Sequence, residues 1–194
     1  MRKQIAKLTS NILNPLVVSL VVILLLSFEA TPGILDALKW SLILIALSML
    51  PVYAVIVYLV HSKRVEGLSI KVRKQRTKVY LLAGVCTGIG YIILLCLRAP
   101  PTLMAIPVAG FSAVVVFMGI NLWWKISIHT AFVAASVAIL IILYGWIATA
   151  TLVLVPLIGW ARIELEHHSL AQVITGALLA ALIVATVFYL FGLV

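Results

Sequence analysis

The stretch that decides the fold is residues 170–192, which read LAQVITGALLAALIVATVFYLFG without one charged side chain. A helix of about 20 apolar residues crosses the hydrocarbon core of a bilayer, so this stretch has the length and composition of a membrane span. Further apolar runs precede it along the chain, and the last two of them are short. They lie near residues 12–28, 36–60, 79–97, 102–122, 129–145 and 147–161.

The composition agrees with a protein whose solvent is lipid. Hydrophobic residues make up 65% of the 194 residues and charged residues only 10%, whereas about a quarter of an average soluble domain is charged. We therefore predict an all-α, polytopic transmembrane bundle of about seven helices, forming a single integral membrane domain over residues 1–194. The two short runs share a tight turn at Tyr144-Gly-Trp146. If they form one hairpin inserted in the bundle, the number of spans is six.

Basic residues predict the orientation and the partners. The N-terminus and the 61–78 loop are rich in Lys and Arg, while the 29–36 loop holds Glu29 and Asp36 and no base. Basic loops face the cytoplasm, which predicts a plasma-membrane protein with these loops inside the cell. Because spans flank the basic runs, we expect anionic lipids rather than nucleic acid as partners of the net charge of +9. The apolar surface also allows a homo-oligomer.

Three polar clusters interrupt the hydrocarbon: SIKVRKQR at 69–76, KISIH at 125–129 and RIELEHHSLAQ at 162–172. Ionisable groups near a bilayer are costly, so each cluster requires a reason. Two apolar runs separate each cluster from the next, and this spacing returns the chain to the same membrane face. We therefore expect Arg, Lys, Ser and His side chains to gather at one site there, a combination that suits a phosphate.

The third cluster offers a functional imidazole. His168 and Gln172 are four residues apart, so on a helix they share a face. The Gln172 side chain can accept a hydrogen bond from one ring nitrogen, which fixes the tautomer and leaves the other nitrogen to attack or to accept a proton. Gly176 continues this face, and its small size lets another helix approach. The plainer alternative is an interfacial histidine that anchors a helix end.

The second cluster places Ser127 and His129 at the start of a helix. Helix N-termini present free N–H groups and a positive dipole end to a phosphate oxygen. Ser127 would add a donor, Lys125 a point charge, and His129 a general acid that protonates a leaving oxygen.

The first cluster contributes Lys71, Arg73 and Arg76. A topology signal explains most of its charge, and one or two of these bases suffice to bind a phosphate.

The order and spacing of these residues resemble the type 2 phosphatidic acid phosphatase (PAP2) superfamily. That family shows Lys-x6-Arg-Pro, Pro-Ser-Gly-His and Ser-Arg-x5-His-x3-Asp motifs. Arg162, His168 and Gln172 reproduce the spacing of the third motif, and Ser127 and His129 match the second. The resemblance covers the C-terminal two-thirds of the chain and implies a PAP2-like helical core.

The resemblance implies a phosphatase that needs neither metal nor cofactor. His168 would attack phosphorus to form a phospho-histidine, and His129 would protonate the leaving group. The phosphoryl oxygens would be held by Arg76, Ser127 and Arg162. The chain departs from the family motifs at Gln172, where Asp is usual, at Ile128, where Gly is usual, and at Ser69, where Lys is usual.

Several functions follow from these observations. The first is an integral membrane enzyme that hydrolyses a lipid phosphate or diphosphate, either polyprenyl or glycerolipid. The alternative is a non-catalytic lipid-phosphate binding or transport protein that keeps the phosphate cradle. A third function, an enzyme that makes or breaks prenyl chains, would need an acidic metal-binding motif. The chain has five Asp and Glu in all and no aspartate-rich cluster that could hold magnesium. The remaining alternative is a plain structural membrane protein.

Overall fold

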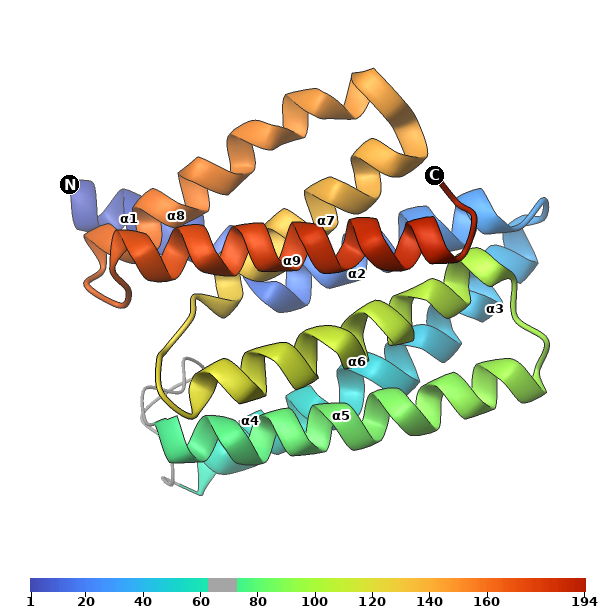
Figure 1. The fold of residues 1–194 in the computed structure, drawn as a ribbon, viewed down its shortest axis with the longest axis horizontal. Helices are drawn as coiled ribbons and strands as arrows, with labels where there is room; N and C mark the ends of the chain where they lie inside the picture. The colour runs from blue at the N-terminus through green and yellow to red at the C-terminus, as the bar shows by residue number, and fades with distance from the viewer. Residues whose placement is uncertain (63–72) are drawn as a thin grey trace. The chain divides into compact units, whose positions relative to one another are not determined.

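The computed structural model describes residues 1–62 and 73–194, and those ranges contain helices and no strand (Figure 1). The helices of the first half are α1 Arg2–Ile12, α2 Pro15–Ala30, α3 Ile34–Leu44, α4 Leu50–His61, α5 Arg73–Cys96 and α6 Pro101–Asn121. Those of the second half are α7 Ile128–Tyr144, α8 Leu154–Glu164 and α9 Leu170–Leu190. A π-helical turn, η1 (Ile45–Met49), joins α3 to α4, and a 3₁₀ segment, η2 (Gly145–Val153), joins α7 to α8.

Six helical segments within the described ranges are long and apolar enough to cross a membrane, and they identify an integral membrane protein. They are Arg2–Ala30, Ile34–Tyr58, Arg76–Cys96, Pro101–Asn121, Ile128–Glu164 and Leu170–Leu190. The all-α bundle of six to seven helices predicted from the sequence is thus confirmed. The fifth segment doubles back through η2 (Figure 1), so its two arms, α7 and α8, correspond to the two short runs expected to form a hairpin.

Proline and glycine punctuate the helices for identifiable reasons. Gly145 ends α7 at a φ of +61°, a conformation that L side chains rarely adopt, so the hairpin turn depends on glycine there. The π-helical turn η1 ends two residues before Pro51, whose ring removes one backbone donor from the helix. Apolar runs that the sequence shows as continuous are therefore divided at positions where backbone hydrogen bonding has to change.

The chain divides into two compact units, Met1–Leu25 with Ile126–Val194, and Leu26–Lys125. In the first unit α7 packs along α9, and α8 returns beside α7 and packs against α1. A buried core of Val133, Val137 and Ile158 joins the two arms of the hairpin. Leu13 and Val18, from the N-terminal segment, pack against this core. Residues that are far apart in sequence therefore build one helical unit.

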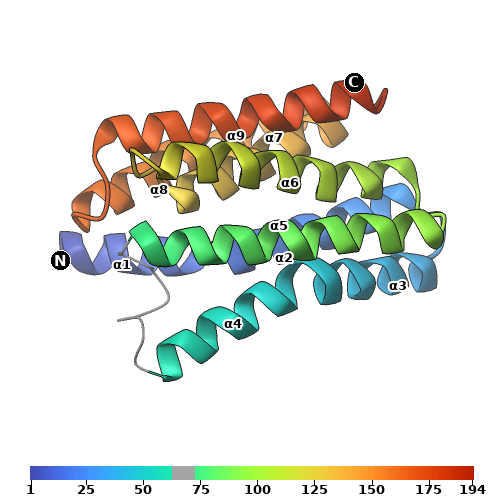
Figure 2. The same ribbon diagram turned by 60° about the horizontal axis from the view of Figure 1, so that its bottom comes forward.

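The second unit contains the antiparallel hairpin of α5 and α6, with η1 and α4 packed on α5 (Figure 2). Small residues line the contact between α5 and α6. A Cβ atom added to Gly84 would lie 3.4 Å from Val114, and one added to Gly110 would lie 3.6 Å from Thr87. These are near-ordinary van der Waals distances between helices that pack through small residues, as membrane helices commonly do.

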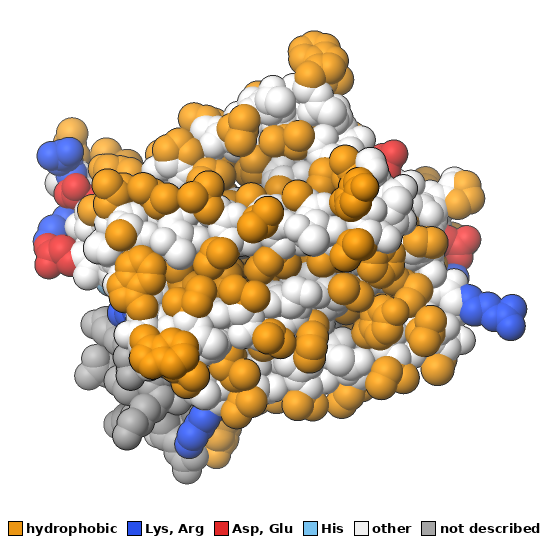
Figure 3. Space-filling model, in the orientation of Figure 1, with side chains coloured by type: hydrophobic (Ala, Val, Ile, Leu, Met, Phe, Trp, Pro, Cys, Tyr) orange, Lys and Arg blue, Asp and Glu red, His pale blue; other side chains and the backbone are white. Residues whose placement is uncertain are grey.

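The outer surface suits a hydrocarbon solvent. On the face drawn in Figure 3, hydrophobic side chains cover the length of the helices, and Lys, Arg, Asp and Glu gather toward the helix ends. Leu178, Leu182 and Leu190 on α9 are each more than 60% exposed. Because burying apolar area is favourable, such a surface is stable only when lipid chains cover it.

Candidate functional site

A capping box begins α9. Ser169 is the N-cap residue, and its Oγ accepts a hydrogen bond from the Gln172 backbone N–H at 3.4 Å. In return, Gln172 Oε1 accepts from the Ser169 backbone N–H at 3.3 Å. This exchange satisfies two donors that a helix start otherwise leaves without partners. The Ser-x-x-Gln spacing that signals such a cap is present in the sequence, in addition to the spacing that pairs Gln172 with His168.

His168 lies two residues before the first residue of α9, rather than on the helix as the sequence suggested. Its Nδ1 is nevertheless 3.0 Å from Gln172 Oε1, so the expected pairing of these two residues is confirmed. Gln172 Oε1 is a carbonyl oxygen and can only accept, so in the neutral ring Nδ1 carries the proton and Nε2 keeps its lone pair. His168 is 8% exposed. The capping box therefore also sets the tautomer of a buried imidazole.

The start of α7 is capped by Ser127. Ser127 Oγ accepts from the Thr130 backbone N–H at 3.5 Å and shares a hydrogen bond with Thr130 Oγ1 at 2.9 Å. Both residues are completely buried. The contact of Thr130 was not predictable, because a threonine inside an apolar run gives no sequence signal of a polar partner. His129, the second residue of α7, is half-buried in the same first turn.

The starts of α7 and α9 meet through backbone. The Ser127 N–H donates to the Gln172 carbonyl at 3.2 Å. One turn further along α9, a Cβ atom added to Gly176 would lie 2.8 Å from the Ser127 carbonyl oxygen. This confirms that the second and third polar clusters come together, and that Gly176 lets another helix approach. We call the meeting of Ser127, His168, Gln172 and Gly176 the α7–α9 junction.

Arg162 lies in the last turn of α8 and is 4% exposed. Its Nη1 donates to Ser10 Oγ of α1 at 2.9 Å. A second contact links α1 to the loop after α8 at the surface, where Lys3 Nζ lies 2.8 Å from Glu166 Oε1. Neither contact has a sequence signal, because the partners are 152 and 163 residues apart. The hydrogen bond and the positive charge of Lys3 hold the pKa of Glu166 below its ordinary value of 4.5.

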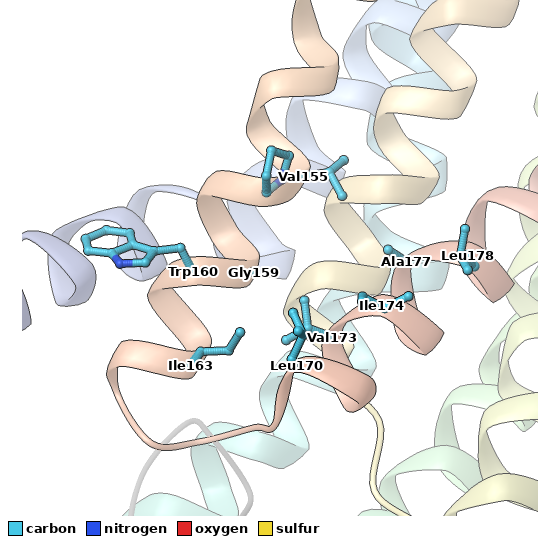
Figure 4. A pocket seen from close by; sticks show the side chains of 10 residues that line it. Val155, Gly159, Trp160, Ile163, Leu170, Val173, Ile174, Ala177 and Leu178 are labelled. Atoms are coloured by element: carbon cyan, nitrogen blue, oxygen red, sulfur yellow. The ribbon is translucent and has the colours of Figure 1, made fainter.

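An apolar groove of about 490 Å³ runs between α8 and α9 (Figure 4). Its α8 wall includes Trp160 and Ile163, and its α9 wall includes Leu170 and Ile174. The remaining lining residues are Val155, Pro156, Gly159, Val173, Ala177 and Leu178. The volume is within the range of about 300–1,000 Å³ found for small-molecule sites. The groove borders the two helices that are joined by the loop carrying His168.

The other predicted phosphate ligands belong to the second unit or lie outside the described residues. Arg76 is 8% exposed on α5, one turn before Tyr80, which is 7% exposed. Lys125 is half-buried in the link between α6 and α7. Arg73 is the first residue of α5. Lys71, like Ser69, falls outside the described residues.

The chemistry available at the junction is that of imidazole, hydroxyl, amide and backbone N–H groups, and Arg162 lies in the last turn of α8, before the loop that carries His168. Two helix N-termini, with their positive dipole ends, start within one hydrogen bond of each other, next to a buried imidazole. Over residues 1–62 and 73–194, no three His, Cys, Asp or Glu side chains are grouped as a metal site would require. Comparison with protein-family models, with curated proteins and with solved structures finds no match to this chain.

Proposed function

We propose that the protein is a PAP2-like membrane phosphatase that hydrolyses a lipid phosphate or diphosphate through a phospho-histidine. The observation that carries the proposal is the hydrogen bond between His168 Nδ1 and Gln172 Oε1, which directs the lone pair of the ring to Nε2. An unprotonated nitrogen on a buried imidazole is a nucleophile for phosphorus. A histidine that merely anchored a helix end would need no partner to select its tautomer.

The proposed reaction has two displacements. In the first, Nε2 of His168 forms a bond to phosphorus while the ester or anhydride P–O bond breaks, and the departing oxygen takes a proton from His129. In the second, water attacks the phospho-histidine, His129 accepts a proton from that water, and inorganic phosphate leaves. The proton given in the first step is thereby recovered in the second, so the enzyme returns to its starting state.

The negative charge on the phosphoryl oxygens requires donors that are already in place. Arg162 is buried beside the loop of His168, and the N-termini of α7 and α9 bring N–H groups to the same end of the unit. The family resemblance would assign further bases to the phosphate, namely Arg76, Arg73, Lys71 and Lys125. Ser127 would contribute through the α7 N-terminus that it caps.

Two features favour a lipid as the substrate. The apolar groove between α8 and α9 offers a hydrocarbon chain a place beside the loop of His168 (Figure 4). Lys3 contacts Glu166 in that loop, so the basic N-terminus lies at the same end as His168. If basic segments face the cytoplasm, the site opens at the cytoplasmic surface of the cell membrane, where anionic lipids are concentrated.

Gln172 also motivates a second candidate, a lipid-phosphate binding or transport protein without turnover. A carboxylate at this position would stabilise the imidazolium that forms during catalysis, and an amide does so less well. The capping box offers a reason for the amide, because Gln at this third helical position reaches back to the N-cap backbone. The two candidates share the phosphate cradle and differ in whether phosphate is released.

The test measures release of inorganic phosphate by the purified full chain in lipid nanodiscs containing phosphatidic acid or a prenyl diphosphate, with a chelator present. We expect turnover by the wild type, a loss of about a thousandfold or more in His168→Ala, and no change in His61→Ala. His61 ends α4 and is exposed, which makes it the matched histidine control. Saturable substrate binding without release would establish the second candidate. Unchanged turnover in His168→Ala would refute the mechanism.

A further inference from the structure

The N-terminal helix α1 places one of its faces against the end of α8. Ala6 and Ser10, one turn apart on this face, are 0% and 5% exposed. Ile5, Leu8 and Ile12 on the opposite side are about half exposed or more. Figure 1 shows α1 beside α8, near the loop that leads into α9. The helix is therefore docked on the element that carries Arg162, by a small and partly polar face.

Two polar contacts fix this docking, one to the Arg162 guanidinium and the other to the Glu166 carboxylate. Arg162 Nη1 donates to Ser10 Oγ at 2.9 Å, and Lys3 Nζ pairs with Glu166 Oε1 at 2.8 Å. The first contact engages the base that is proposed to hold phosphate. The second engages the carboxylate of Glu166, which is only four residues after Arg162 in sequence. Without Lys3, this carboxylate would be available to pair with the Arg162 guanidinium.

The chemistry of the Ser10 contact matters as much as its distance. A guanidinium on a long side chain has many rotamers, and holding it in one of them requires an acceptor. A carboxylate acceptor would also neutralise the guanidinium and compete with an anionic ligand, because Arg binds carboxylate and phosphate with the same donor fork. A serine hydroxyl accepts the hydrogen bond without carrying charge. The contact with Ser10 thus orients Arg162 without adding a negative charge beside the guanidinium.

We propose that α1 is part of the phosphate site, with Ser10 as a positioning residue that orients the Arg162 guanidinium toward the phosphoryl group. This inference rests on the proposed function and adds to it a residue that no motif contains. Lys3 assists by holding the Glu166 carboxylate away from the guanidinium. The first 12 residues therefore form a wall of the site in addition to beginning a membrane span.

The experiment compares full-length variants for kcat and KM on the lipid phosphate and for inhibition by orthovanadate, which resembles the phosphoryl group in transit. Ser10→Ala should lower kcat/KM about tenfold and weaken vanadate inhibition by a similar factor, as expected for losing a hydrogen bond to a charged group. Ser10→Thr keeps the hydroxyl and should recover most of both. Ser41→Ala is the matched control, since Ser41 is a buried helical serine whose Oγ donates to Ala37 on its own helix.

The decisive comparison is made in an Arg162→Ala background. There Ser10→Ala should have no further effect, because the group it positions is gone. Vanadate inhibition and kcat/KM equal to wild type in Ser10→Ala, with both reduced in Arg162→Ala, would overturn the inference and leave the proposed function standing. A tenfold loss from Ser10→Ala that persists in Arg162→Ala would overturn it too. A wild type that neither turns over nor binds vanadate would overturn the function and the inference together.

Discussion

The α7–α9 junction and the α5–α6 hairpin both use glycine to bring membrane helices together, but with different tolerance. In the hairpin, Cβ atoms added to Gly84 or Gly110 would meet side chains at 3.4 and 3.6 Å. At the junction, a Cβ added to Gly176 would meet the Ser127 carbonyl oxygen at 2.8 Å. A side chain can change rotamer, whereas a capped helix start cannot move without breaking its hydrogen bonds.

The difference teaches where this protein requires accuracy. The hairpin needs only a close fit, which many combinations of small side chains provide. The junction must keep two hydrogen bonds within one turn of helix. One joins the Ser127 N–H to the backbone carbonyl of Gln172, and the other joins the Gln172 side-chain oxygen to His168 Nδ1. Polar contacts at such close approach are sensitive to small displacements, because a buried polar group that loses its partner is costly.

The largest effect is expected from Gly176→Ala. The added methyl forces α7 away from α9 and strains the hydrogen bond from Ser127 to Gln172. We expect a loss of about 1–3 kcal/mol in the free energy of unfolding, as for overpacking in a core. The measurement is thermal or denaturant unfolding in detergent micelles, followed by circular dichroism.

Gly110→Ala is the matched control for this variant. Its methyl would meet Thr87 at an ordinary distance, and replacing glycine inside a helix is expected to add about 0.5–1 kcal/mol of stability. If the two variants were equally stable, the junction would be no tighter than the hairpin, and the comparison drawn above would fail.

The next effect is expected from Gln172→Ala, which removes the acceptor shared by His168 and Ser169. Loss of the hydrogen bond from the Ser169 N–H, one half of the capping box, should cost about 0.5–1.5 kcal/mol of stability. Loss of the imidazole partner should lower phosphate release by about 10- to 100-fold, the range seen when an orienting partner of a functional histidine is removed. Both are measured on the same preparation, by unfolding and by phosphate assay.

Gln172→Glu separates the two roles. The carboxylate keeps acceptor atoms for His168 and Ser169, so stability should stay near that of the wild type. Its negative charge favours protonated imidazole, so the acid limb of the pH–rate profile should move to higher pH. An unshifted acid limb together with full activity would indicate that Gln172 serves the helix cap alone.

The smallest effect is expected from Glu166→Gln, outside the junction. Glu166 has a lowered pKa in the folded state because of Lys3, so its contribution is fully present above the unfolded value near 4.5 and disappears as the pH falls through the lower folded value. The melting temperatures of wild type and variant should differ slightly at pH 7 and converge below pH 4.5. High salt should shrink the difference at pH 7, because the pair is exposed. A difference that grew toward acid pH would contradict this account of the pair.

The helices were predictable from the sequence, whereas the side-chain contacts of the candidate site were only partly predictable. Runs such as 170–192 are recognisable as membrane helices, because a lone segment of about 20 apolar residues can satisfy its backbone hydrogen bonds in lipid only as a helix. The pairing of His168 with Gln172 was predictable because the two residues are only four positions apart in sequence. His168 lies before α9 because Ser169, the residue directly after it, has the side chain and backbone for an N-cap.

Long-range contacts were beyond the sequence. The Ser10 hydroxyl reaches Arg162 because α1 docks on α8, and hydrophobic periodicity says nothing about which helices become neighbours. Thr130 supports Ser127 from inside an apolar run, where threonine is an unremarkable residue. The motifs of the proposed family include no residue of α1, and the contacts from α1 depend on packing that only the folded chain specifies.

The most direct test of the central claim is to identify the atom that carries phosphate during turnover. The wild type is mixed with a radiolabelled lipid phosphate, quenched in alkali and digested. Mass spectrometry identifies the phosphorylated peptide, and chromatography of its alkaline hydrolysate separates Nδ1-phosphohistidine from Nε2-phosphohistidine. Because Gln172 Oε1 engages Nδ1, the account predicts phosphate on Nε2 of His168. The phosphorylated fraction should be smaller in Gln172→Ala than in the wild type. Phosphate on Nδ1, or on a residue other than His168, would contradict it.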